Sequence, residues 1–437
     1  MTIVILVLII ILFMSLQYGF LGLDNYYTTV LPFIYLLLNI IYLYKYKKGD
    51  ILSFEFVFAI SFFLCCFLTP IILPQMDSYV SRIFLADSNT QYKTYIVCMI
   101  GYLFYMLGLI TKKGTEEDVA YLETNITLAV YSNYVCTFFL LLFFVFGGSS
   151  LLSMYGTGGD IENRLGEWGE YLTYAMIAYT ISIITNIVLI RGNNQRLIKI
   201  PKLFVLNSVV LLSMLAFSGY RSNLIQLILP LVWVYDKYYK KIEKWKMVLL
   251  LILAMCFLVY SGLTRQGSSF DFQSLDMLTL FRDFSAANAA NAYLINYADS
   301  NGVTYGSNWI LQILSIIPFL QSVFVAIFGR GFISESSSRF FTDQMDSLNS
   351  GLGTGIIGDI YYSTGLLGVC VLMFLLGVVC KKLSNCDSFI KNVMFLVFLG
   401  NAMFASRVEY FYIARMMAFS AILMWALLKL SGTKNKI

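Results

Sequence analysis

Apolar runs long enough to cross a bilayer alternate with short polar segments along nearly the whole chain. A membrane-spanning α-helix needs about 20 such residues, and the runs predict an all-α polytopic membrane bundle of about twelve transmembrane helices. The first run, MTIVILVLIIILFMSLQYGF, lacks a basic n-region and a cleavage site, so we interpret it as an uncleaved first span. The later runs lie at 29–44, 51–74, 94–111, 127–146, 171–190, 203–218, 222–235, 246–263, 353–380, 390–406 and 412–430.

One long polar segment, residues 264–352, interrupts this pattern. It contains TRQGSSFDFQSLDM and FRDFSAANAANAYLINYADSNG, and it leads into GLGTGIIGDIYYSTGLLGV, where glycines precede an apolar run. Binding and catalytic residues concentrate on such connecting segments. We therefore predict three parts: the earlier spans in 1–263, a large external loop in 264–352 that contains amphipathic or re-entrant helices, and the last three spans with a tail in 353–437.

Lysines in the short loops orient the chain, because cytoplasmic loops of membrane proteins are enriched in basic residues. They gather on every second side of the membrane, and only Lys93 falls on the other side. Both termini are therefore expected in the cytoplasm, with the long polar segment outside. The lysine clusters are KYKK at 45–48, KK at 112–113, RGNNQRLIKIPK at 191–202, DKYYKKIEKWK at 236–246, KK at 381–382 and the tail KLSGTKNKI.

The run WILQILSIIPFLQSVFVAIF at 309–328 tests this orientation, because it is also long enough to span. If it spanned alone, the lysines at 381–382 would face outward. A compensating span at 277–297 would carry Arg282 and Asp283, and such a charge at a helix centre costs about 2.5–3.5 kcal/mol of insertion free energy. We therefore predict a re-entrant or interfacial helix at 309–328, kinked at Pro318.

Composition agrees with a membrane protein and narrows its chemistry. Hydrophobic residues make up 59% of the chain and charged residues 13%, where a soluble domain carries about 25% charged residues. Histidine is absent, so acid–base chemistry falls to Asp, Glu or Tyr, and we expect no metal site and no cofactor. The net charge of +5 is divided among short clusters, which argues against a nucleic-acid partner. The eight cysteines show neither disulfide nor zinc spacing and are expected to be buried.

The arginines follow the reverse of the lysine pattern, since most lie outside or at the outer ends of spans. A guanidinium stays charged and offers a planar fork of donors that matches phosphate oxygens. Arg221 begins one span and Arg265 ends another, at the depth of a lipid diphosphate headgroup. The alternative, that single outer arginines snorkel or pair with carboxylates, stays open. The outer arginines are Arg82, Arg164, Arg221, Arg265, Arg282, Arg330, Arg339, Arg407 and Arg415.

Without histidine, an external general base must be one of ten carboxylates: Asp160, Glu162, Asp271, Asp276, Asp283, Glu335, Asp343, Asp346, Asp359 or Glu409. Most of them lie in polar surroundings, and Asp359 is the preferred candidate. It lies in the first turns of a predicted span, beside Tyr361 and Tyr362, and an ionisable residue in a span is a functional candidate by default. Equally, an acidic residue near a helix start complements the helix dipole, and both interpretations stay open. Asn288 and Asn291 suit sugar hydroxyls, although an amphipathic surface helix explains their spacing equally well.

These patterns resemble the bacterial oligosaccharide repeat-unit polymerases of the O-antigen, Wzy-type family. The resemblance covers most of the chain: a loop with the lone Arg164, SGYRSN at a span start, a span ending in TRQG, a long external segment with TYGSNW and IIPF, and the closing GLGTGIIGDIYYSTGLLGV.

The resemblance implies a glycosyltransferase of the bacterial inner membrane that joins repeat units carried on undecaprenyl diphosphate at the periplasmic face. Its partners would be the lipid-linked oligosaccharide as donor and acceptor, membrane lipid and a possible chain-length regulator. Asp359, with Arg221 and Arg265, is the expected catalytic set, and Asp359 is expected to activate the acceptor. The expected substrate-binding set is Arg164, Arg282, Arg339, Glu335, Tyr361 and Arg407.

Three rival functions make different predictions. A lipid-linked oligosaccharide flippase also has about twelve spans, but transporters show internal repeats that this chain lacks. An O-antigen ligase or acyl-modifying enzyme is opposed by the missing histidine, because the related ligases use one in their long external loop. A purely structural membrane protein does not explain the outer arginines.

Overall fold

The computed structural model describes residues 1–18, 24–47, 50–72, 88–111, 125–148, 168–192, 201–217, 221–243, 245–247, 249, 277–317, 320–329, 335–344, 353–384 and 388–433. All regular secondary structure in these ranges is helical, with sixteen α-helices and a few short 3-10 and π turns. The predicted all-α fold is confirmed.

The chain forms two compact units, each assembled from segments far apart in sequence. Unit 1 contains Met1–Glu116, Asp276–Asn385 and Ala402–Arg415, and unit 2 contains Glu117–Leu275, Cys386–Asn401 and Met416–Ile437. In unit 1 the helices that follow the long polar segment therefore pack with the first helices of the chain.

The helices of unit 1 are α1 (Thr2–Tyr18), α2 (Asp24–Tyr46), α3 (Phe54–Cys66), α4 (Thr69–Ile72), α6 (Ser88–Ile110), α14 (Met277–Asn301), α15 (Ile310–Leu314), α16 (Leu320–Phe328), α17 (Ser337–Gln344) and α18 (Ile356–Ser384). Two short 3-10 turns, η6 (Ser307–Trp309) and η8 (Ala405–Arg407), also belong to it. The helices of unit 2 are α7 (Ile126–Phe143), α10 (Trp168–Gly192), α11 (Lys202–Phe217), α12 (Arg221–Val234) and α19 (Phe389–Gly400), with the π turns η2 (Phe144–Gly148) and η4 (Tyr235–Tyr239). The last helix, α20 (Tyr412–Ser431), starts in unit 1 and ends in unit 2.

Five described helices are long and apolar enough to cross a bilayer, which makes this a multi-pass membrane protein. They coincide with five of the predicted spans and are parts of α6, α7, α10, α18 and α20. Five further apolar helices are shorter, at Thr2–Gln17, Val30–Tyr46, Phe54–Cys66, Lys202–Ala216 and Phe389–Gly400. The predicted total of about twelve spans is therefore not confirmed. The run at 246–263 lies almost entirely outside the described residues.

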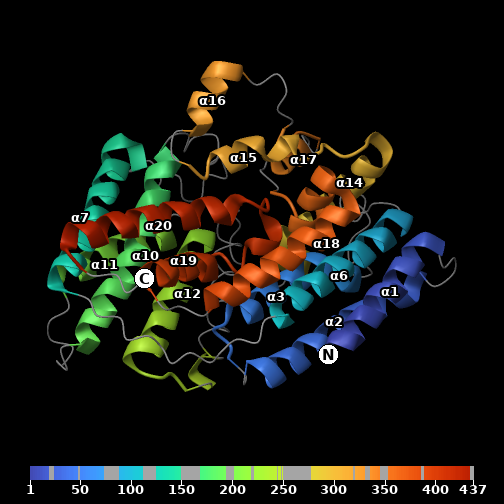
Figure 1. The fold of residues 1–437 in the computed structure, drawn as a ribbon, viewed down its shortest axis with the longest axis horizontal. Helices are drawn as coiled ribbons and strands as arrows, with labels where there is room; N and C mark the ends of the chain where they lie inside the picture. The colour runs from blue at the N-terminus through green and yellow to red at the C-terminus, as the bar shows by residue number, and fades with distance from the viewer. Residues whose placement is uncertain are drawn as a thin grey trace. The chain divides into compact units, whose positions relative to one another are not determined.

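The helix α18 packs directly against α6 in unit 1, and the two run side by side in Figure 1. Glycines allow their backbones to touch. A Cβ added at Gly377 would stand 2.1 Å from the carbonyl oxygen of Tyr105, and one at Gly108 would stand 2.2 Å from that of Phe374. Small residues at such crossings permit close van der Waals packing, which drives helix association in membranes.

Aromatic side chains fill the core of unit 1 beside this crossing. Tyr35 on α2 and Tyr102 on α6 have ring centroids 4.3 Å apart, and Phe58 on α3 packs 4.9 Å from the ring of Tyr105. The Tyr35 hydroxyl donates to the carbonyl oxygen of Ala59 at 2.7 Å, which satisfies it inside the core.

Buried polar side chains join α7 to α10 in unit 2. The amides of Asn133 and Asn186 bond each other reciprocally at 3.1 and 3.2 Å. The hydroxyls of the residues directly before them, Ser132 and Thr185, lie 2.9 Å apart. Hydrogen bonds between helices of this kind strengthen association in a membrane.

The prediction of a re-entrant or interfacial helix at residues 309–328 stays a prediction. Instead of one spanning helix, the described residues form η6, the five-residue α15 and the nine-residue α16. Neither α-helix approaches the length of about 20 residues that a span needs. Pro318 lies outside the described residues, so its predicted kink is not tested. The six described cysteines are buried and free, as expected, and Cys256 and Cys386 lie outside the described residues.

Candidate active site

The amino-terminal part of α18 is set apart from the rest of the helix by a break at Gly365, whose φ of 70° and ψ of −166° are not helical. Such a break removes helical partners from the carbonyls of the preceding turn. The loop after α14 replaces them: the Thr304 N–H donates to Tyr362 O at 3.0 Å, and the Gly306 N–H donates to Ser363 O at 3.2 Å. Backbone hydrogen bonds thus join the motifs TYGSNW and GDIYYSTG, which are well separated in sequence.

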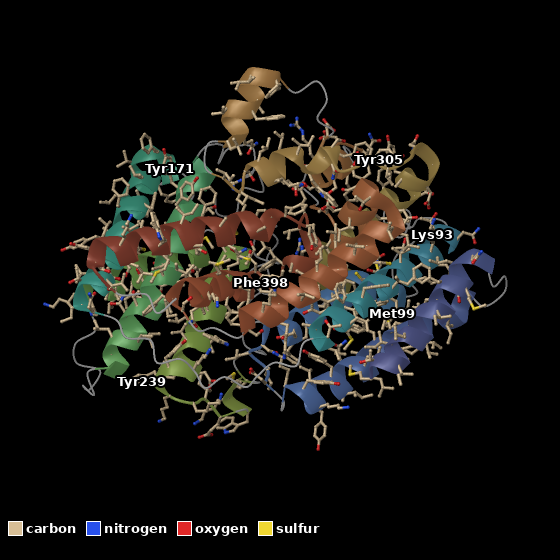
Figure 2. All side chains as sticks on the ribbon, in the orientation of Figure 1. Lys93, Met99, Tyr171, Tyr239, Tyr305 and Phe398 are labelled. Carbon is tan, nitrogen blue, oxygen red and sulfur yellow. The ribbon has the colours of Figure 1, made fainter. Side chains whose placement is uncertain are left out.

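Tyr305 stands between these two backbone bonds. Its φ of 52° is left-handed, a conformation that costs a non-glycine residue about 1–3 kcal/mol, and its side chain is 89% exposed. Figure 2 labels Tyr305 on this loop and Lys93 near the start of α6. The flanking bonds to α18 hold the tyrosine outward in spite of the strain.

Asp359 also connects these two motifs through its side chain. It is completely buried, and both carboxylate oxygens accept hydrogen bonds from other segments. Oδ1 accepts from the Ser337 hydroxyl at 2.6 Å and from the Asn308 amide at 3.4 Å. Oδ2 accepts from the Trp309 indole N–H and the Tyr410 backbone N–H, each at 2.9 Å. One carboxylate therefore joins α18 to η6, to the start of α17 and to the turn that precedes α20.

A second carboxylate contacts the next residue of α17. Glu409, in the turn before α20, accepts from the Ser338 hydroxyl at 3.0 Å and from the Ser338 N–H at 3.4 Å. Trp309 packs its indole against Phe411, with ring centroids 5.3 Å apart, so the turn also covers Asp359. Burial raises the pKa of Tyr410, and its hydroxyl stays protonated and donates to Leu372 O at 2.8 Å. Tyr410 is thus unsuited to act as a base.

The glycines before Asp359 have a packing role. The Gly358 N–H donates to the side-chain oxygen of Asn291 at 2.7 Å, and a Cβ at Gly355 would stand 2.0 Å from that same oxygen. Asn288 is also buried and donates to Cys66 O at 3.1 Å. Neither alternative for Asn288 and Asn291 holds, because both amides join α14 to neighbouring segments inside unit 1 and do not lie on a surface.

Tyr361 faces a different group of residues from Asp359. Its hydroxyl donates to Asp299 at 2.8 Å, and Lys93 forms an ion pair with the other oxygen of that carboxylate at 2.5 Å. The lysine also lies 5.6 Å from the Tyr361 ring centroid. The predicted outer lysine therefore has a specific partner at the end of α14.

Three other predicted substrate-binding residues lie on the segments that Asp359 holds together. Arg339 is exposed on α17, with Nε 3.8 Å from Asp343, and Glu335 is exposed just before that helix. Arg407, in η8, places its guanidinium 5.6 Å from the ring centroid of Phe284 on α14. Asp359, Arg339, Glu335 and Arg407 thus belong to one cluster of connected segments.

The remaining predicted site residues are less completely described. Arg221 is the first residue of α12, and Arg282 lies in α14, as far as their backbones show. Arg164 and Arg265 lie outside the described residues. No contact described for unit 1 tests a catalytic role for any of these arginines or for Asp359, and the predicted site stays a prediction.

Sequence reasoning missed Ser337, Asn308 and Trp309 as site residues, and it named Glu409 only as one of ten possible external bases. A polar residue in a polar loop carries no sign that its partner lies 22 to 51 positions away. The motif TYGSNW was noted for its resemblance to the family, and that was the available signal for Asn308 and Trp309. Among the described residues, no cluster of three or more Cys, Asp or Glu side chains fits a metal ion.

Together, the apolar helices and the polar cluster at one end of a broken helix define a class: a multi-pass membrane protein with a buried carboxylate site. The family model for O-antigen polysaccharide polymerase Wzy matches residues 1–436. The chain belongs to this family, whose members polymerise the repeat units of O-antigen and act as glycosyltransferases on lipid-linked repeat units. Comparisons with curated proteins and with solved structures gave no match.

Proposed function

We propose that this polymerase joins undecaprenyl-diphosphate-linked repeat units at the external face of the bacterial inner membrane, without a metal ion. The growing chain leaves its own lipid diphosphate and is transferred to a sugar hydroxyl of the incoming lipid-linked unit. Both termini lie in the cytoplasm.

The observation that carries this proposal is the position of the Asp359 cluster on α18. The helix has Lys381 and Lys382 in its last turn and Asp359 in its first. If the lysines are cytoplasmic, as the general bias of membrane proteins favours, the cluster lies at the external end. Lipid-linked repeat units that wait there for transfer would have their diphosphates at the same depth.

The arginines supply the binding chemistry in this proposal. A lipid diphosphate is both the anchor of each substrate and the leaving group, and guanidinium groups bind such oxygens through paired, charge-assisted hydrogen bonds. Arg221, Arg265 and Arg164 hold the diphosphates, while Arg282, Arg339 and Arg407, with Glu335 and Tyr361, contact the glycan. Asp359 belongs with Arg339 and Arg407, since it fixes the segments that carry them.

Substitution in cells tests the assignment. Arg221→Ala, Arg265→Ala and Asp359→Ala are each expected to leave surface glycan with a single repeat unit, while the protein still inserts in the membrane. Arg191→Ala serves as the control, because it removes an arginine of the predicted cytoplasmic side and leaves long chains. Normal long chains from all three test variants would overturn the site assignment.

A further inference from the structure

The Asp359 carboxylate uses its acceptor positions to hold the site together. An ionised carboxylate offers about four lone-pair positions. Four donors occupy them at Asp359, two on each oxygen, and the side chain has no exposed surface. A sugar hydroxyl would have to displace one of these donors to reach it.

What Asp359 holds includes the turn that carries Glu409. The Tyr410 N–H donates to Asp359, and Tyr410 directly follows Glu409. On α17, Ser337 donates to Asp359 and the adjacent Ser338 donates to Glu409. Two successive serines of α17 therefore bond the two carboxylates, and the bonds from Ser338 hold Glu409 through its Oε1 atom.

Glu409 has the properties that Asp359 lacks. It is partly exposed, and its described contacts all go to Oε1. Within the described residues, Oε2 is left to accept another hydrogen bond. Arg407 lies two positions earlier in the same turn, and Arg339 follows Ser338 on α17. The carboxylate thus stands among the residues proposed to contact the substrate.

We propose that Glu409 is the general base that activates the acceptor hydroxyl, and that Asp359 is the positioning residue that holds Glu409 in place. The inference rests on the proposed function. Glu409 thereby takes the role in acceptor activation that the sequence predicted for Asp359. Asp359 then affects chain growth only indirectly, through the position of Glu409.

The step that follows is balanced. The acceptor sugar oxygen attacks the anomeric carbon of the donor chain while its proton passes to Glu409 Oε2. A new glycosidic C–O bond forms, and the bond between the anomeric carbon and the diphosphate oxygen breaks. The electron pair of that bond stays on the lipid diphosphate, which leaves as an anion. Glu409 then releases the proton to water.

A structural alternative is that Glu409 only caps the start of α17 through Ser338. Glu409→Gln distinguishes the general-base role from the capping role. Its amide oxygen still accepts from Ser338, but the side chain no longer takes up a proton. The assay is chain growth by the full-length protein in proteoliposomes, with lipid-linked repeat units extracted from a host that lacks its polymerase. General-base catalysis contributes about 10²–10⁴-fold, so Glu409→Gln is expected to slow chain growth at least about 100-fold without a change in thermal stability.

Two further variants complete the test. Chain growth by Glu409→Ala should be partly restored by added acetate, which a capping role does not explain. Glu243→Gln, an exposed carboxylate of the DKYYKKIEKWK cluster, is the matched control and should match the unsubstituted protein. Chain growth by Glu409→Gln within about threefold of the unsubstituted protein, or absence of acetate rescue, would overturn the inference. If the unsubstituted protein itself produces no ladder, the proposed function fails instead.

Discussion

At the scale of single residues, the hydrogen bonds that Asp359 accepts hold the segments of the candidate site together. Its oxygens accept bonds from three other segments of unit 1, and Trp309 and Tyr410 supply N–H groups that have no other described acceptor. A buried donor left without its acceptor costs about 1–3 kcal/mol. The carboxylate therefore contributes to stability as well as to the site.

Asp359→Asn should lower the thermal unfolding midpoint, because whichever oxygen becomes an NH₂ group then faces donors. If the amide nitrogen replaces Oδ2, two N–H groups lose their acceptor, which corresponds to about 2–6 kcal/mol at 1–3 kcal/mol for each group. Tryptophan fluorescence of the purified protein in detergent measures the midpoint. Asp343→Asn, at a half-exposed position on α17, is expected to leave it unchanged. Equal midpoints for the two variants would contradict this account of Asp359.

The importance of Asp359 was predictable and its partners were not. A carboxylate inside an apolar run is costly and therefore noticeable. Ser337 and Asn308, by contrast, lie in polar stretches where serine and asparagine are ordinary. Their role depends on a fold that brings η6 and α17 to the same end of α18, and no local pattern reports that.

At the scale of elements, glycines decide how closely α6 and α18 approach. Gly377→Ala places a methyl group 2.1 Å from Tyr105 O, so the helices must separate. Overpacking of this kind costs about 1–3 kcal/mol. We expect a lower unfolding midpoint and a shifted Asp359 site with slower chain growth. Leu367→Ala, at a position of α18 that is 77% exposed, is the control and should change neither. A stable and fully active Gly377→Ala protein would argue against the close helix crossing.

The connection between α2 and α3 depends on a buried ion pair. Lys47 Nζ lies 2.6 Å from Glu55, and the two side chains are 15% and 2% exposed. Burial lowers the pKa of Lys47, but the Glu55 carboxylate outweighs this, and the pKa is raised overall. The lysine therefore stays charged across the physiological range.

Lys47→Met should destabilise the protein by about 3–5 kcal/mol, because it leaves the Glu55 charge buried without its partner. The double variant with Glu55→Gln removes both charges and should recover most of that loss. Chemical unfolding in detergent compares the two. A double variant less stable than Lys47→Met alone would contradict the explanation.

Element boundaries show where hydropathy succeeds and where it fails. Five predicted spans appear as long helices, since their apolar runs leave no other structure in a bilayer. The predicted span at 390–406 does not, because α19 ends at Gly400. There the backbone packs against Gln226 O, 2.4 Å from where a Cβ would stand. The residues that follow Gly400 form turns and then η8, and hydropathy records neither these turns nor such close packing between segments.

At the scale of the whole molecule, the orientation rests on the lysine bias. Tyr305→Cys lies in the predicted external segment and is highly exposed. Glu243→Cys lies in a predicted cytoplasmic cluster, where the glutamate side chain is 61% exposed. In a cysteine-free background, a membrane-impermeant maleimide should label the first in intact cells and the second only after permeabilisation. The reverse pattern would invert the topology and place the Asp359 cluster inside.

The measurement that tests the central claim most directly is reconstitution of the purified chain in proteoliposomes with lipid-linked repeat units. The account predicts a ladder of products that lengthens with time without added metal, and a strongly slowed ladder from Glu409→Gln. Passage of the lipid-linked unit across the bilayer without any chain growth would contradict the account and favour a flippase.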